Sequence, residues 1–228
     1  TGSMAQTLTI GVRAGPESID PHFTATGTHA EALKHVFDTL TWSGDGLEIE
    51  PRLATSWKAV SNDVWEFKLR SGVKFHDGSD FTAEDVKFSI EYYRDRDPEA
   101  AWMQEIIESV TVDGNDVTLS LSRPYGNLLT EFMTYSVVPE SVWGSVADPL
   151  TYEGADMVIG SGPFVFESWD PAAGRFVFTA NEDYFQGKPN VDRLEVNVYR
   201  TMDALVMALA SGEIDTWWDY SGEFPYTH

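Results

Sequence analysis

Residues 51–57 of this chain read PRLATSW, residues 64–70 read VWEFKLR, residues 75–78 read FHDG, and residues 81–87 read FTAEDVK. In the second element, Trp65, Phe67 and Leu69 alternate with charged side chains, which is the period of a half-buried strand. The FHDG element contains the aspartate and glycine that tight turns favour. Thr82, followed three residues later by Asp85, is typical of a helix N-cap with an acid near the positive end of the helix dipole. The stretch therefore predicts a strand, a turn and a helix, in that order.

These four elements, taken together and in this order, resemble the signature of the peptide/nickel class of extracellular solute-binding proteins, family 5. Further landmarks of that family are SIDPH at 18–22, GSGPF at 160–164, NEDYF at 181–185, GKP at 187–189 and GEID at 212–215. The resemblance extends over residues 6–220. It stops where a typical member of the family is less than half complete, so we interpret the chain as a fragment.

The resemblance implies a mixed α+β fold that is similar to the type II periplasmic binding proteins. Family members have a discontinuous domain I, a smaller inserted domain II, and a domain III that closes over the ligand. By position, residues 6–48 and 162–220 correspond to an incomplete domain I, and residues 49–161 correspond to domain II. Domain III is expected to be absent from this chain.

Local patterns predict several further elements. A capping box at 28–31 opens a helix whose inner side carries Leu33, Val36, Phe37 and Leu40. An Asp-Gly pair predicts a hairpin over 110–119. Strands are expected at 8–12, 164–169, 175–180 and 194–198. A helix over 201–210 should bury Met202, Leu205, Val206 and Leu209 and end at Gly212.

The composition narrows the class of protein. The chain has 37 acidic and 15 basic side chains, and its net charge of −22 disfavours binding to nucleic acid or to an anionic membrane surface. We attribute this excess to solubility and habitat, with attraction of cationic ligands as the alternative. There are no cysteines, which excludes disulfides and thiol chemistry.

The cellular location follows only from the family resemblance, which implies a periplasmic or extracellular protein, with or without a lipid anchor. Residues 1–4 (TGSM) resemble an expression tag in front of a mature start near Gln6. A signal segment would then have been removed. No stretch of the sequence reaches the length of about 18–20 apolar residues that a transmembrane helix needs.

Sequence motifs for catalysis are absent: there is no Gly-x-Ser-x-Gly, no phosphate-binding Gly-Lys-Ser/Thr loop and no His-Glu-x-x-His. We therefore expect no enzyme activity, no cofactor and no metal site. His76 belongs to the FHDG turn and is expected to be structural. A hydrolase would require a nucleophile and a base placed together in a cleft.

Pockets for small solutes combine rigid apolar walls with a few polar groups, so aromatic residues at positions implied by the family are the main candidates. Trp102 lies in a segment similar to the one in which nickel-binding members place a cleft tryptophan, and Tyr135 precedes a segment from which relatives present cleft residues. The other candidates lie in the DPH loop and after GEID. The expected ligand-binding residues are His22, Phe23, Thr24, Thr26, Trp102, Tyr135, Trp217, Trp218 and Tyr220. For each aromatic residue, the alternative is a place in the core or between domains.

The resemblance implies the substrate-binding component of an ABC importer, which captures a small solute and delivers it to a membrane permease. Short peptides are the expected cargo, a nickel ion or nickel chelate is the first alternative, and sugars or opines remain open. A stand-alone two-domain interaction module is the alternative of another class. If domain III is missing, apolar residues such as Trp217, Trp218, Phe224 and Tyr226 should be exposed, which predicts self-association of the fragment.

Overall fold

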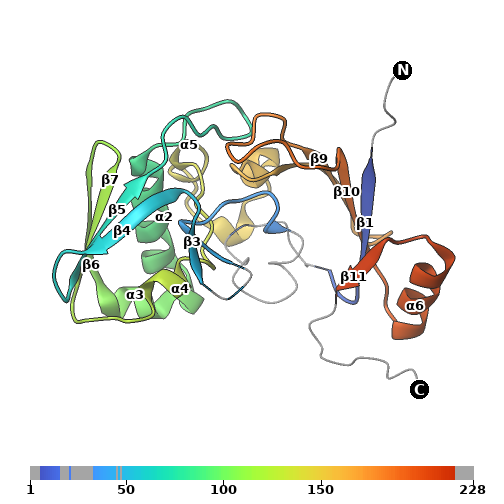
Figure 1. Ribbon diagram of the computed structural model, residues 1–228, viewed down its shortest axis with the longest axis horizontal. Coiled ribbons are helices and arrows are strands. Elements are labelled where there is room, and N and C mark those ends of the chain that lie inside the picture. The colour runs from blue at the N-terminus through green and yellow to red at the C-terminus, as the bar shows by residue number, and fades with distance from the viewer. Residues whose placement is uncertain (1–5, 16–20, 22–32, 45, 47, 219–228) are drawn as a thin grey trace.

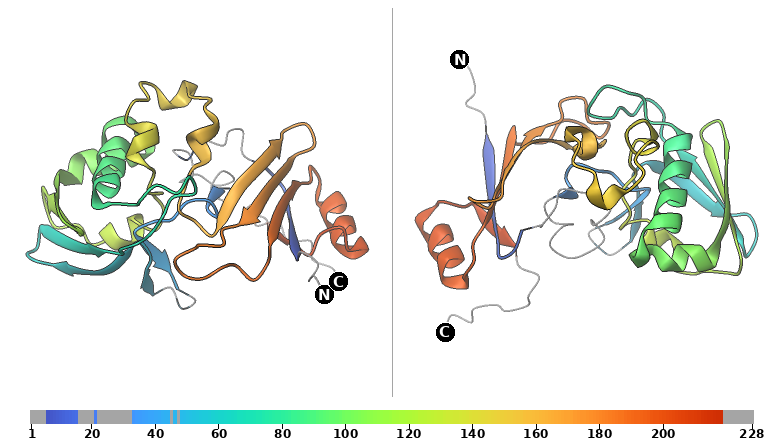
Figure 2. Two further views of the ribbon diagram at one scale, coloured as in Figure 1. Left: turned by 90° about the horizontal axis from the view of Figure 1, so that it is seen from above. Right: turned by 180° about the vertical axis from the view of Figure 1, so that it is seen from behind.

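The computed structural model describes residues 6–15, 21, 33–44, 46 and 48–218 (Figure 1). Two sheets lie toward opposite ends of the molecule, and helices pack mainly around the sheet that comes from the middle of the chain (Figures 1 and 2). Helices and strands alternate through these residues, which confirms the mixed α+β fold.

The first sheet has five strands in the order β11-β1-β10-β9-β8. Its strands are β1 (Thr7–Val12), β8 (Phe164–Asp170), β9 (Arg175–Ala180), β10 (Arg193–Val198) and β11 (Thr216–Trp218). Strand β1 runs parallel to both β10 and β11, whereas the β10–β9 and β9–β8 pairs are antiparallel. The first strand of the chain thus lies between strands from its far end, which makes this unit discontinuous in sequence.

The second sheet has four antiparallel strands in the order β4-β5-β7-β6. They are β4 (Ala54–Ala59), β5 (Val64–Leu69), β6 (Ile107–Asp113) and β7 (Asp116–Leu121). The alternation predicted for β5 is confirmed, since Phe67 and Leu69 are buried and Lys68 is exposed. The predicted hairpin is also confirmed, and Gly114 in its turn has a positive φ of 60°.

Helix α2 (Ala83–Arg96) covers this second sheet. Its predicted start is confirmed by a capping box, in which the Thr82 backbone N–H donates to Asp85 at 2.8 Å. The adjacent residues Tyr92 and Tyr93 contribute to different apolar clusters, one beside each sheet. Helix α2 therefore contributes to both cores.

The remaining elements are short. Strands β2 (Thr41–Ser43) and β3 (Ile49–Pro51) form a two-stranded ladder. The helices are α3 (Ala101–Ile106), α4 (Leu128–Glu131), α5 (Glu140–Trp143), α6 (Met202–Ser211), and the 3₁₀ turns η2 (Pro98–Ala100), η3 (Pro149–Thr151) and η4 (Ala155–Val158).

The helix expected to continue to Leu40 ends much earlier. Its predicted start at 28–31 lies outside the described residues, and the described helical conformation ends at Leu33. The backbone carbonyls of His35 and Val36 accept hydrogen bonds from Phe164 and Gly162, at 3.0 and 2.8 Å. Long-range pairing with the GSGPF segment thus replaces the helical hydrogen bonds, although the predicted apolar residues of this segment are buried.

A buried carboxylate joins distant parts of the sequence near the junction of the two sheets. Asp38 accepts hydrogen bonds from Arg52 Nε at 3.0 Å, the Tyr184 hydroxyl at 2.9 Å and the Ser161 hydroxyl at 3.1 Å. Burial raises the pKa of Asp38 from 3.8 to about 6, although Arg52 and the hydrogen bonds act in the opposite direction. Asp38 therefore links the segment before the four-stranded sheet to two segments after it.

Helix α6 is less buried than its sequence predicts. Gly212 ends it in the left-handed conformation, with φ of 75°, and Leu205 is buried, as predicted. However, Val206 is 40% exposed and Leu209 38% exposed, and the neighbouring Met207 is 72% exposed. The prediction that Val206 and Leu209 are packed inside is wrong for the described residues, because α6 contacts the sheet along one narrow face only.

Candidate functional site

Trp102 and Tyr135 lie together, although 33 positions separate them in the sequence. The Trp102 indole Nε1–H donates to the Tyr135 hydroxyl at 3.1 Å. Both side chains are half-buried at the surface of the four-stranded sheet's core. The pair offers part of an aromatic surface together with a hydroxyl group.

Two more rings extend this surface. The Tyr125 ring stacks on Trp102 at a centroid distance of 5.2 Å and an interplanar angle of 11°, and Tyr93 meets Tyr135 edge-on at 5.2 Å. The Tyr125 hydroxyl donates to Glu131 at 3.2 Å, and this carboxylate contributes to raising the pKa of Tyr125, after the larger effect of desolvation. Packing on both sides fixes the ring orientations, so the surface is preformed. Such a surface fits a flat or apolar group of a solute.

Trp217 and Trp218 belong to a different part of the molecule. They lie on β11, at the opposite end of the molecule from α3, which carries Trp102 (Figures 1 and 2). Trp217 packs against α6, whereas Trp218 is 48% exposed and the Lys34 ammonium lies 4.5 Å from its ring centroid. The structure therefore separates the predicted aromatic residues into two groups.

The other predicted site residues, His22, Phe23, Thr24, Thr26 and Tyr220, lie outside the described residues, as do Phe224 and Tyr226. The exposure of Trp218 agrees with the expectation that apolar residues of the five-stranded sheet's unit are exposed. His76, expected to be structural, has its ring Nε2 2.9 Å from the Gly162 carbonyl oxygen, and burial lowers its pKa.

The carboxyl ends of three parallel strands meet beside Trp218. In the register of the sheet, Val12 at the end of β1 pairs with Val198 on one side and with Trp218 on the other. The Tyr199 N–H donates to the Val12 carbonyl at 2.8 Å just beyond this point. In open sheets that contain parallel strands, ligands bind outside the carboxyl ends of those strands. This edge is the stronger candidate for a binding site.

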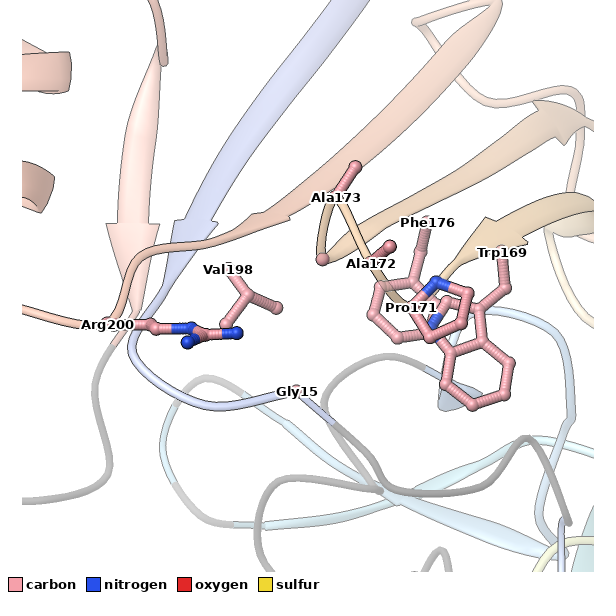
Figure 3. Close-up of a pocket in the computed structure, with 9 residues that line it drawn as sticks. Gly15, Trp169, Pro171, Ala172, Ala173, Phe176, Val198 and Arg200 are labelled. Atoms are coloured by element: carbon pink, nitrogen blue, oxygen red, sulfur yellow. The ribbon is translucent and has the colours of Figure 1, made fainter.

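A pocket of about 410 Å³ opens at this edge (Figure 3). It lies between the loop after β1, the turn that joins β8 to β9, and the end of β10. Its lining residues are Gly15, Trp169, Pro171, Ala172, Ala173, Gly174, Phe176, Val198 and Arg200. None of these residues lies in a motif from which the sequence predicts a binding role. Arg200 lies two residues after a predicted strand. This position suggests a binding role only once β1 and β10 are known to pair in parallel, so that their carboxyl ends lie together.

The part of the chain that the structure describes contains neither a metal-binding cluster nor a membrane-spanning helix. There, no three or more His, Asp or Glu side chains group in a way that could hold a metal ion. The described helices are all too short or too polar to cross a bilayer.

Known proteins resemble this chain in sequence and in structure. The bacterial extracellular solute-binding proteins, family 5 (middle), match residues 48–227. The oligopeptide-binding protein AppA of Bacillus subtilis (strain 168) is 29% identical over 217 residues, which cover 91% of this chain and 40% of AppA. The structure of AppA in complex with a nonapeptide has a TM-score of 0.83 at 27% identity and covers 92% of this chain and 44% of AppA.

A nickel-binding relative is similar as well. NikZ from Campylobacter jejuni, in complex with Ni(L-His), has a TM-score of 0.78 at 27% identity, over 91% of this chain and 42% of NikZ. The chain thus spans less than half the length of these relatives.

Proposed function

The chain belongs to the bacterial extracellular solute-binding proteins of family 5, and on this basis we propose that it forms part of a protein that captures a short peptide outside the cytoplasm. The peptide would then be delivered to the permease of an ABC importer. The observation that carries this proposal is the open pocket at the carboxyl ends of β1 and β10. Its position is the one at which sheets of this kind bind ligands.

Peptides are preferred as cargo because the chain is similar, over 92% of its length, to AppA, whose structure contains a nonapeptide. A nickel chelate is the second candidate, favoured by the likeness to NikZ with Ni(L-His) and by Trp102 in a segment similar to that of nickel-binding members. A stand-alone interaction module is the third. Since the family is defined by solute binding, we propose no catalytic residue.

The proposed domain division is residues 6–48 with 162–220, and residues 49–161. The two sheets support it, since one is built from β1 and β8–β11 and the other from β4–β7. The apolar clusters do not follow this division completely. Val138, Trp143 and Met157, from the inserted part, pack in the cluster that includes Phe176 and Phe178 of the five-stranded sheet.

The proposed ligand contacts are of two kinds. Trp102 and Tyr135 would contact cargo from the inserted part, and Trp218 with Trp217 would contact it from the strand edge. His22, Phe23, Thr24, Thr26 and Tyr220 remain candidates because they flank β1 and β11 in the sequence. A lipid anchor, and self-association through an apolar face that includes the exposed Trp218, are further proposals for this protein.

Calorimetry on this chain and on the complete product of its gene tests the proposal. The probes are di- to pentapeptides, nickel with and without histidine, and oligosaccharides. We expect peptides to bind the complete product and raise its melting temperature. Binding to residues 1–228 alone should be much weaker, because a site closed from one side leaves the ligand solvated while the entropic cost of association remains. Binding of nickel–histidine but no peptide would replace the first candidate with the second.

A further inference from the structure

Arg200 gives the pocket at the strand edge an unusual electrostatic character. Ten of the fifteen basic residues form ion pairs with carboxylates of described residues: Arg52, Lys58, Lys68, Lys74, Lys87, Arg94, Arg123, Arg175, Lys188 and Arg193. Arg200 forms no ion pair or hydrogen bond with any described residue. In a chain with a net charge of −22, this is an uncommon state for a guanidinium group.

The wall facing Arg200 is apolar and flat. Trp169 and Phe176 are cross-strand partners whose rings stack at a centroid distance of 5.6 Å and an interplanar angle of 10°. Figure 3 shows the Arg200 side chain extending beside Val198 toward the space in front of Trp169, Phe176 and Pro171. A guanidinium and an aromatic wall thus face one opening.

The aromatic wall is held in place by its own turn. The Asp170 carboxylate accepts the backbone N–H groups of Ala172 and Ala173, both at 3.0 Å. Gly174 adopts a positive φ of 64°, and its carbonyl accepts the Val198 N–H at 2.8 Å, which ties the turn to β10. These contacts indicate a pocket whose shape exists before a ligand arrives.

The loop after β1 leaves the pocket open because residue 15 is glycine. A Cβ atom on Gly15 would lie 2.8 Å from Val198 Cγ2 and 3.4 Å from the Phe176 ring. A side chain at this position would therefore project into the space between these two residues. Replacing Gly15 with an apolar residue would therefore fill part of the pocket without changing its charge.

Two other pockets in the described residues contrast with this one. A pocket of about 430 Å³ beside the FHDG turn contains Lys74, which is paired with Asp80, and His76, which is bound to the Gly162 carbonyl. A smaller pocket on the four-stranded sheet contains Lys58 and Lys68, which are paired with Glu66 and Asp116. Of the three pockets, only the one at the strand edge presents a cation without a protein partner among the described residues.

We propose that the strand-edge pocket binds a carboxylate through Arg200 and an adjacent apolar group against Trp169, which is backed by the buried Phe176 ring, and Val198. The planar guanidinium presents paired N–H donors that match the two oxygens of a carboxylate. The inference rests on the proposed function, and it narrows the cargo to solutes that carry an acid next to an aromatic or branched group. In a peptide, that acid is either the terminal carboxylate or an acidic side chain.

The first test uses small probes, so it does not depend on peptide binding. Binding of 3-phenylpropionate and of its neutral amide is measured by calorimetry and by NMR shifts of the Trp169 indole N–H, assigned with Trp169→Phe. We expect the acid to bind at least about ten-fold more tightly than the amide, as for a hydrogen bond to a charged group. Arg200→Gln should remove this preference, and Gly15→Val should weaken both probes.

Arg123→Gln is the matched control, because Arg123 is an exposed arginine on the other sheet's unit and should leave the preference unchanged. Thermal melts identify any variant that fails to fold, and Arg200→Lys then provides a milder substitution that should retain part of the preference. Equal binding of acid and amide to the wild-type protein, or an unchanged preference in Arg200→Gln, would overturn the proposal.

The second test separates the two sources of the carboxylate. The binding affinity of Ala-Ala-Phe is compared with that of its C-terminal amide, and the affinity of Ala-Glu-Phe amide with that of Ala-Gln-Phe amide. If amidation of the C-terminus weakens binding, and the weakening requires Arg200, the pocket binds the terminal carboxylate of the peptide. If the Glu-to-Gln exchange weakens binding instead, the pocket binds an acidic side chain. If peptides bind but neither change matters, the proposed function stands and this inference fails. If phenylpropionate binds as expected and peptides do not, the pocket stands and the peptide function fails.

Discussion

The two sheets differ in how completely the described residues cover them. Around the four-stranded sheet, Phe67, Val117 and Leu119 are fully buried, and α2 lies across them. Five large apolar side chains of the described residues are exposed. Four of them lie on α6 or β11, in the unit of the five-stranded sheet: Val206, Met207, Leu209 and Trp218. The unpaired Arg200 and its pocket lie on this same unit.

Stability and ligand binding therefore depend on different parts of this chain. The buried side chains of the closed core cannot reach a ligand, so their substitutions should act on folding. An edge with exposed apolar surface and an unpaired cation still has interactions to gain, so its substitutions should act on binding.

Phe67→Ala should be the most damaging change to stability. Phe67 is fully buried and meets the Phe132 ring edge-on at 5.7 Å, so its loss leaves a cavity in the closed core. We expect the free energy of unfolding to fall by about 3–5 kcal/mol, measured by urea denaturation. A loss no larger than that of an exposed position such as Met207→Ala would contradict the contrast between the two regions.

Asp38→Asn should change how stability depends on pH. The folded-state pKa of Asp38 is about 6, above its ordinary value of 3.8. Between pH 3.8 and pH 6, the folded protein therefore keeps a proton on Asp38 that the unfolded chain releases. The stability that this group contributes is present below about pH 4 and is lost as the pH rises through 6. Relative to wild type, the variant should gain about 2–3 kcal/mol between pH 4 and pH 7, measured by denaturation at each pH.

His35→Gln is the natural counterpart, because the two effects have opposite signs. Burial, and then the charge of Lys34, lower the pKa of His35 from 6.5 to about 4. Its contribution is present above pH 6.5 and is lost as the pH falls toward 4. This variant should therefore gain stability relative to wild type on acidification. Parallel pH profiles for wild type and both variants would refute the linkage.

Trp102→Phe and Tyr135→Phe should have intermediate effects. Tyr135→Phe removes the hydrogen bond of 3.1 Å between the two side chains and keeps the ring, whereas Trp102→Phe removes the same bond together with part of the indole ring system. In a double-mutant cycle on unfolding, we expect a coupling energy of about 0.5–1.5 kcal/mol. If the pair contacts cargo, the same variants should also weaken peptide binding in the complete gene product, and a coupling of zero would mean that the two groups act independently.

Met207→Ala should have the smallest effect. Met207 is 72% exposed, so the free energy of unfolding should change by no more than about 0.5 kcal/mol. Leu205→Ala on the same helix is the matched comparison, because Leu205 is buried and its truncation should cost about 2–5 kcal/mol. Similar losses for both, together with a dimer mass in light scattering, would show that a second copy covers this face.

Local patterns predicted much of the fold because their causes are local. The alternation around Phe67, the capping box of Thr82 with Asp85, and the left-handed Gly212 depend on neighbours within a few residues, and the structure confirms all three. The helix expected to reach Leu40 failed for the opposite reason. The carbonyls of His35 and Val36 take their hydrogen-bond partners from residues more than a hundred positions away.

The candidate site was less predictable than the fold. The family resemblance indicated Trp102 and Tyr135, and the structure brings these two together, but no local pattern showed that the Trp217–Trp218 pair lies elsewhere. Arg200 and Trp169 carry no motif. They become a candidate site only when β1 is inserted between β11 and β10 and the β8–β9 turn is placed beside the loop after β1.

The family, the mixed fold and most element boundaries were predictable from the sequence, because turn, cap and strand signals act over short distances. The meeting of the strand ends, the lack of a partner for Arg200 among the described residues and the exposure of one apolar face depend on the tertiary structure. These properties depend on strand pairing across nearly two hundred residues, from Val12 to Val198, and no local pattern specifies the partner of a strand.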